Sequence, residues 1–101
     1  MGIQSAIYDA LTIFGCNILV EKRFVNILDD YGVFRNNRVL RVVVRDLVEY
    51  DFFVRLFAKT NYELDSFEYR SSVEHDVLDQ FPFREDVVHL VMDAIIDAVI
   101  N

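Results

Sequence analysis

The segment from Arg38 to Val48 constrains the fold most, because its composition and its pattern point to different structures. It is rich in valine, which favours a β-strand. Its polar residues nevertheless recur at intervals of three and four: Arg38, Arg41, Arg45 and then Glu49. On a helix these residues share one stripe, whereas in a strand Arg38 would face away from Arg41 and Arg45. We therefore predict a helix capped by Asn36 or Asn37, with four inward apolar residues: Leu40, Val43, Val44 and Leu47.

The rest of the chain shows helical spacing as well. Apolar residues recur with this period from Ile3 to Phe14, and Gly15 follows as a helix stop. Further helices are predicted from Ile18 or Leu19 to Tyr31, from Phe52 to Lys59 after a break near Tyr50, from Ser66 to Gln80, and from Glu85 onwards. The fold class is therefore all-α, a compact orthogonal bundle of five to six short helices in a single domain, residues 1–101.

Local signals refine the ends and faces of these helices. Asn17 is predicted to cap the second helix, and Asp51 the helical piece after Tyr50. Thr60 to Leu64 is predicted as a loop, followed by a capping box made by Asp65 and Glu68. The helix that begins at Ser66 has an uneven inner face, predicted to consist of Phe67, Arg70, Val77 and Phe81.

Composition limits the classes of protein that the chain can belong to. Its 101 residues are 53% hydrophobic, and a single cysteine excludes an internal disulfide framework. The most apolar run, Val87 to Ile100, contains three polar residues and is shorter than the roughly 20 apolar residues that span a bilayer. The N-terminal segment has no basic region typical of a secretory signal. We expect a cytoplasmic protein, and the lone Cys16 fits a reducing compartment.

The charges divide the chain into two unequal parts. The net charge is −7, yet residues 1–60 carry 8 bases and 7 acids, while residues 61–101 carry 2 bases and 10 acids. An acidic face is predicted at Asp65, Glu68, Glu74, Asp76 and Asp79, and a basic stripe at Arg38, Arg41 and Arg45. Two such patches can join copies head to tail, or they can face each other within one copy.

The last helix carries two apolar stripes. Val87, Val91 and Ile95 suffice for a core-facing side. The second stripe would then be an exposed patch that marks an interface, made of Val88, Met92, Ile96 and Val99. A fully buried central helix is the alternative. From the doubled stripe we predict a homo-oligomer.

The sequence offers little that suggests chemistry. His75 with Asp79, and His89 with Asp93, have the spacing of ordinary helical pairs. A di-metal bundle would require Glu-x-x-His twice, and the chain has neither copy. No serine lies in a G-x-S-x-G turn, no glycine-rich phosphate loop is present, and Cys16 has no histidine near it in sequence. We expect no enzyme activity, no metal and no cofactor.

One segment has a likeness to other proteins. Ile18 to Tyr31, read as ILVEKRFVNILDDY, resembles a recurrent segment in an uncharacterised all-helical domain family of Bacteroidetes bacteria. The valine-rich helix from Val39 to Val48 and the closing segment from Phe83 to Ile95 are similar to that family too, whereas Tyr62 to Asp79 differs. The resemblance implies a bacterial helical domain and no particular activity.

These observations favour a non-catalytic protein–protein interaction module that associates with itself. The alternative is a nucleic-acid-binding regulator whose Arg38, Arg41 and Arg45 contact phosphates. Because the net charge of −7 repels a polyanion, we expect no nucleic-acid binding at physiological salt. No membrane partner is expected.

Overall fold

The chain is described by a computed structural model that covers residues 2–101. Six α-helices and two 3₁₀ helices make up the fold, and residues 2–101 contain no strand, so the predicted all-α class is confirmed. The elements are α1 (Ile3–Phe14), η1 (Cys16–Val20), α2 (Arg23–Asp30), α3 (Arg38–Glu49), η2 (Phe52–Ala58), α4 (Asn61–Leu64), α5 (Phe67–Gln80) and α6 (Glu85–Ile100). Met1, which belongs to the predicted domain 1–101, lies outside the described residues.

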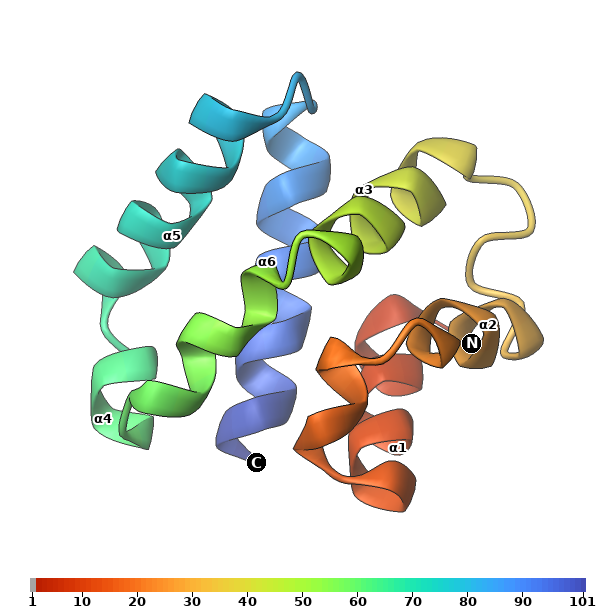
Figure 1. The fold of residues 1–101 in the computed structure, drawn as a ribbon, viewed down its shortest axis with the longest axis horizontal. Helices are drawn as coiled ribbons and strands as arrows, with labels where there is room; N and C mark the ends of the chain where they lie inside the picture. The colour runs from red at the N-terminus through yellow and green to blue at the C-terminus, as the bar shows by residue number, and fades with distance from the viewer. Residues whose placement is uncertain (1) are drawn as a thin grey trace.

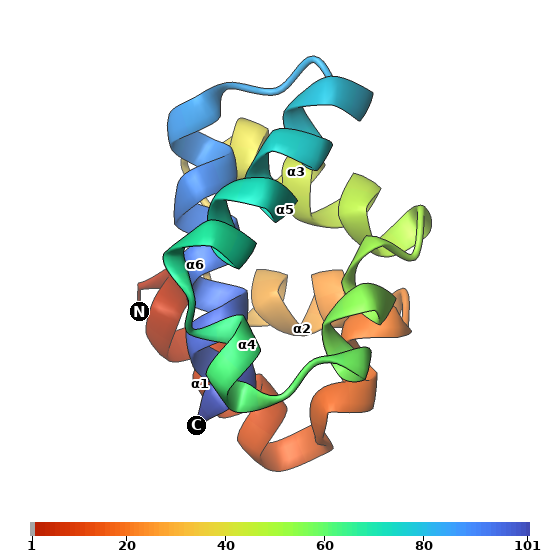
Figure 2. The same ribbon diagram turned by 90° about the vertical axis from the view of Figure 1, so that its left-hand side faces the viewer.

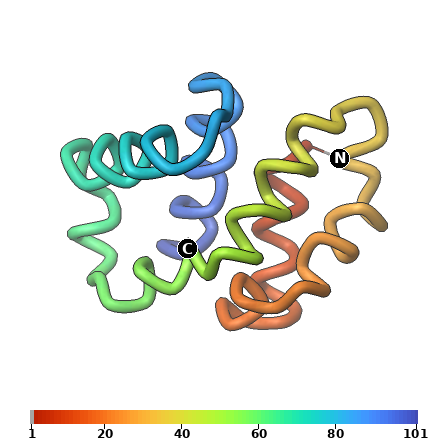
Figure 3. The backbone as a smooth tube through the Cα atoms, turned by 45° about the horizontal axis from the view of Figure 1, so that its top comes forward, coloured from red at the N-terminus to blue at the C-terminus, as the bar shows by residue number. Residues whose placement is uncertain are grey.

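Helix α6 lies at the centre, and α1, α3, α4 and α5 all contact it. Figure 1 shows α5 on one side of α6 and α1 on the other, with α3 crossing between them. In Figure 2 the segment from α4 through α5 faces the viewer, and the α5–α6 turn lies at the end opposite α4. Figure 3 shows α4, α5 and α6 grouped on one side and α1, α2 and α3 on the other. No helix in the described range is long and apolar enough to cross a membrane.

Helix α3 confirms that the polar spacing, and not the valine content, decides its structure. The side chain of Asn37 accepts a hydrogen bond from the backbone N–H of Leu40 at 3.0 Å and caps the helix. All four predicted inward residues are buried, together with Val48. The arginine stripe consequently lies on the outer side of α3.

The predicted second helix is divided into η1 and α2. Glu21 is extended between them, and Asn17 lies inside η1, so the predicted Asn17 cap is wrong. Leu19 and Leu28 are both buried. On one continuous helix they would be two and a half turns apart and would face opposite sides. The break lets both side chains reach the core.

The stretch between α3 and α5 differs from the prediction in its caps. Asp51 adopts a left-handed backbone with φ 53° and separates α3 from η2. Its side chain makes no capping hydrogen bond to η2, so the predicted Asp51 cap is wrong. The predicted loop contains α4, which begins with a capping box made by Thr60 and Glu63. Ser66 caps α5 by accepting from the N–H of Tyr69, so the predicted box of Asp65 and Glu68 is wrong.

The predicted interface stripe on α6 is also wrong. Val88, Met92 and Ile96 are 0% exposed, and Val99 is half-buried against the same core. Both apolar stripes of α6 are covered because four helices pack around it. An oligomer, if it forms, must use another surface, and self-association stays a prediction.

The burial of Met92 predicts a loss of stability and not a loss of association. Met92→Ala should lower the free energy of unfolding by about 2–5 kcal/mol, since it leaves a cavity in the core. Val54→Ala, at an exposed position, should change it by no more than about 0.5 kcal/mol. Urea unfolding followed by circular dichroism measures both. A Met92→Asp variant that stays folded would contradict the burial of this residue.

Candidate functional site

A groove lies between α3 and the loop that joins α5 to α6. Its volume is about 730 Å³. Helix α3 contributes the predicted stripe, Arg38, Arg41 and Arg45, and the loop contributes Arg84. Apolar side chains line it as well, chiefly Val39, Val42, Pro82 and Phe83, and Asp46 is its one acid. We call this the arginine groove.

The arginines of the groove differ in how far they are neutralised. The Nε of Arg41 donates to Asp29 at 2.9 Å, Arg45 pairs with Asp46 at 3.2 Å, and Arg84 pairs with Asp86 at 2.8 Å. Arg38 has no ion pair with any residue from 2 to 101. Each guanidinium carries five N–H donors, so one carboxylate leaves donors free.

Stacked aromatic rings hold the loop side of the groove. Phe83 stacks in parallel on Phe81 with 4.9 Å between ring centroids, and Tyr50 meets Phe81 edge-on at 5.3 Å. Phe81 and Phe83 also pack against the core. Pro82 between them adds a fixed φ. The apolar wall is therefore set before any ligand arrives.

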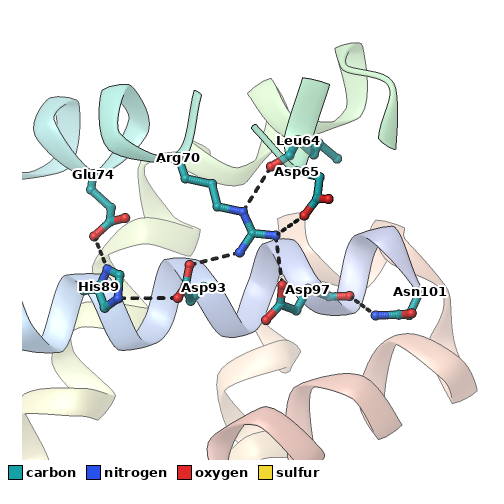
Figure 4. A network of polar contacts seen from close by, with 8 residues as sticks. All are labelled: Leu64, Asp65, Arg70, Glu74, His89, Asp93, Asp97 and Asn101. Carbon is teal, nitrogen blue, oxygen red and sulfur yellow. Dashed lines mark hydrogen bonds and ion pairs between the residues drawn. The ribbon is translucent and has the colours of Figure 1, made fainter. Parts of the chain in front are cut away.

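Arg70 is the centre of a second polar cluster, shown in Figure 4. Its side chain is only 15% exposed and reaches α6 from α5. It donates to Asp93 at 3.0 Å, to Asp97 at 2.9 Å, to Asp65 at 3.3 Å and to the carbonyl of Leu64 at 3.2 Å. Burial opposes the charge of Arg70, but the hydrogen bonds to Asp97 and Asp93 outweigh it and raise its pKa. One side chain thus fastens α5 to α6 and to the end of α4.

His89 lies beside this cluster, between two carboxylates (Figure 4). Its Nδ1 is 2.8 Å from Oε1 of Glu74 on α5, and its Nε2 is 3.4 Å from Oδ2 of Asp93. The hydrogen bond and charge of Glu74 raise the pKa of His89, with a smaller contribution from Asp93. Arg70 and partial burial act in the opposite direction.

The ligand atoms of Glu74, His89 and Asp93 lie within 4.8 Å of one another. The two carboxylates, however, face different ring nitrogens, and Arg70 is bonded to Asp93. This geometry suits a proton on each nitrogen better than one shared metal ion. His75 is exposed and pairs with Asp79 at 3.3 Å as an ordinary helical pair.

The predicted acidic face is partly paired within the chain, and not by the arginines of α3. Asp65 pairs with Arg70, Asp76 with Arg55, and Asp79 with His75. Glu74 pairs with His89 on α6, and Glu68 has no ion pair with residues 2–101. The end of this face forms an exposed corner where α4 meets α5, made of Tyr62, Glu63, Asp65, Phe67 and Glu68. We call it the acidic corner.

Sequence reasoning found the α3 side of the groove and missed the rest. Arg84 and Phe83 are more than thirty residues from α3, and no local pattern links them to it. Arg70 was expected on the inner face of α5, and the structure places it there. Phe67, expected beside it, is 79% exposed instead. The predicted core-facing position of Arg70 was the one signal for this cluster, because a poorly exposed guanidinium requires acidic partners.

Comparisons of the chain with protein-family models, with curated proteins and with solved structures find no match. The resemblance to a helical family of Bacteroidetes bacteria therefore stays a prediction. The chain's own features, the arginine groove and the acidic corner, are what a proposal on function can use.

His89 predicts a pH dependence of stability. A folded-state pKa above the unfolded value of about 6.5 adds stability that is fully present below that pH and is lost as the pH rises through the folded pKa. His89→Gln should therefore destabilise the protein more at about pH 6 than at about pH 8, a window in which carboxylates stay ionised. Urea unfolding at both pH values measures this.

Glu74→Gln is the matched variant for this test. It keeps the side-chain shape and removes the charge, so the pKa of His89, followed by NMR titration, should fall. An equal effect of His89→Gln at both pH values would contradict the assigned role of Glu74 and Asp93.

Arg70 predicts a second stability effect. Arg70→Met should lower the free energy of unfolding by about 1–3 kcal/mol, because three carboxylates lose their counter-charge and the Leu64 carbonyl loses a donor. Arg70→Lys should recover part of it, since an ammonium cannot reproduce the planar fork. Arg23→Met, which removes an exposed pair with Glu21, should cost no more than about 1 kcal/mol. A loss in Arg70→Met equal to that in Arg23→Met would show that the cluster does not hold α5 on α6.

Proposed function

We propose that this protein is a non-catalytic protein–protein interaction module whose arginine groove binds an acidic segment of a protein. The observation that carries the proposal is the gathering of four arginines and an apolar wall in one groove of a chain with net charge −7. In a basic protein such a groove would be expected by chance. Here its sign is opposite to that of the whole molecule, which supports a dedicated surface.

The lining of the groove suggests the chemistry of its ligand. Guanidinium groups bind carboxylates through two parallel hydrogen bonds, and Arg38 has no carboxylate of its own within residues 2–101. Phe83 and Val39 offer an apolar surface between the charges. The fitting ligand is a segment with carboxylates on either side of an apolar or aromatic side chain. Two different interactions would then have to be met at once, which favours specificity.

The alternative is a nucleic-acid-binding regulator that uses Arg38, Arg41 and Arg45. It is supported by the position of these residues on one exposed side of α3. It is weakened by the net charge and by the number of arginines that remain free. Asp29, Asp46 and Asp86 pair with three of them and leave Arg38 as the one arginine of the groove without a carboxylate among residues 2–101, which suits a few carboxylates better than a run of phosphates. The free, exposed thiol of Cys16 supports the cytoplasm as its compartment.

Arg38 gives the sharpest test, since its replacement breaks no ion pair among residues 2–101. We expect fluorescein-labelled synthetic peptides with glutamates around one phenylalanine to bind, as measured by fluorescence anisotropy at near-physiological salt. Arg38→Glu should weaken binding about tenfold or more, in line with a charged hydrogen bond worth about 1.5–3 kcal/mol. Phe83→Ala should weaken it as well.

Arg35→Glu is the matched control. It changes the net charge by the same amount as Arg38→Glu, and Arg35 is exposed and lies outside the groove. An equal loss in Arg35→Glu and Arg38→Glu would show that only net charge matters and would contradict the groove. A mixed-sequence DNA duplex or single strand that binds more tightly than the peptides, with a steep salt dependence that Arg38→Glu removes, would establish the nucleic-acid alternative.

A further inference from the structure

We propose that the occupant of the arginine groove is the acidic corner of a second copy of this chain, so that copies join head to tail. The inference rests on the proposed function, since it names the acidic segment that the groove binds. The partner is identified by its chemistry, which the same chain supplies at another place on its surface.

The acidic corner has the composition that the groove requires. Tyr62 is 89% exposed and Phe67 is 79% exposed, and both exceed every other large apolar residue between residues 2 and 101. Glu63, Asp65 and Glu68 flank these two rings in sequence. Aromatic side chains held in water amid carboxylates match a groove that presents apolar side chains amid guanidinium groups.

The unpaired charges of the two surfaces correspond as well. Glu63 has Lys59 at 3.7 Å and Asp65 has Arg70 at 3.3 Å, but Glu68 has no ion pair with residues 2–101. In the groove, Arg38 is the arginine that likewise has no ion pair with residues 2–101. We therefore assign Glu68 of one copy to Arg38 of the next, with Phe67 directed to the apolar wall around Phe83.

The two surfaces cannot meet within one chain. Phe67 begins α5, whereas the loop wall of the groove follows the last residue of the same helix. The 14 residues of α5 separate them by about 20 Å, and Figure 2 shows α4 and the α5–α6 turn at opposite ends of this side of the molecule. A contact between such different surfaces is heterologous, so it leads to an open chain of copies or to a ring.

Both surfaces are also held in shape before they meet. The capping residues Thr60 and Ser66 and the Arg70 cluster fix the corner, and the stacked rings of Phe81 and Phe83 fix the groove wall. Little backbone order then has to be gained on binding. Because the charges concerned are exposed and each copy carries a net charge of −7, we expect the association to be weak.

Charge reversal tests the assignment in both directions. Sedimentation velocity should show that the wild-type protein sediments faster as its concentration rises to the order of 100 µM, whereas Arg38→Glu alone and Glu68→Arg alone stay monomeric. An equimolar mixture of these two variants should associate again, because every contact then joins opposite charges. Phe67→Ala should weaken association, and the exposed-site controls Arg35→Glu and Ile13→Ala should leave it unchanged.

Three results would overturn the inference: a wild-type protein that stays monomeric, an association that neither reversal changes, or a mixture that does not recover. Thermal melting of each variant shows that it is folded, which is expected since all these positions are exposed. If wild type stays monomeric while the glutamate–phenylalanine peptides still bind through Arg38, the self-docking inference fails and the proposed function stands. If the peptides fail to bind and no association occurs, the proposed function fails with it.

Discussion

The burial of α6 on nearly all sides is the constraint on which the rest of the structure depends. A helix with two apolar stripes has a low free energy only when several other helices cover it. Helices α1, α3, α4 and α5 do so, and together they put Val88, Met92 and Ile96 out of contact with water. Helices from both ends of the sequence, α1 as well as α3, α4 and α5, therefore have to pack against the same central helix.

The narrow polar strip of α6 determines where α5 lies. Arg70 on α5 is only 15% exposed and needs opposite charges at the edge of the core, and Asp93 and Asp97 supply them from α6. The same guanidinium binds Asp65 and the Leu64 carbonyl, so it also orients the end of α4. The acidic corner lies at one end of α5 and the loop wall of the groove at the other. Both surfaces therefore derive their position from the way α5 is fastened to α6.

Sequence patterns predicted the elements that periodicity alone determines. The bounds of α1, the nature of α3 and the helical character of the segment from Glu85 onwards follow from stripes that repeat within one helix. Periodicity could not show the break between η1 and α2, because each short piece has a plausible inner side and only the shared core reveals that Leu19 and Leu28 must point the same way. Nor could it show that both stripes of α6 are covered, since burial depends on how many neighbours a helix has.

The candidate site was predictable only where it is local. Arg38, Arg41 and Arg45 form a stripe on one helix, and the structure keeps them on one surface. Arg84 and Phe83 join them through tertiary packing, which spacing does not encode. Capping residues were misassigned for a related reason: Thr60 with Glu63, Ser66, and Asp65 with Glu68 are overlapping candidates within a few residues. The choice among them depends on where α4 must turn to place Leu64 in the core.

The combination of an acidic molecule and a basic groove bears on the class of partner. Double-stranded DNA carries a charge about every 1.7 Å along its axis and would extend well past the groove, over a chain whose residues 61–101 hold ten acids and two bases. A protein segment brings only a few carboxylates and ends where the groove ends. It also brings apolar side chains, which can pack against Val39, Pro82 and Phe83. A phosphate backbone has no such groups. The acidity that repels an extended polyanion is thus compatible with a short acidic and aromatic ligand, and the groove needs only its local charge, within a screening length of about 10 Å, to attract one.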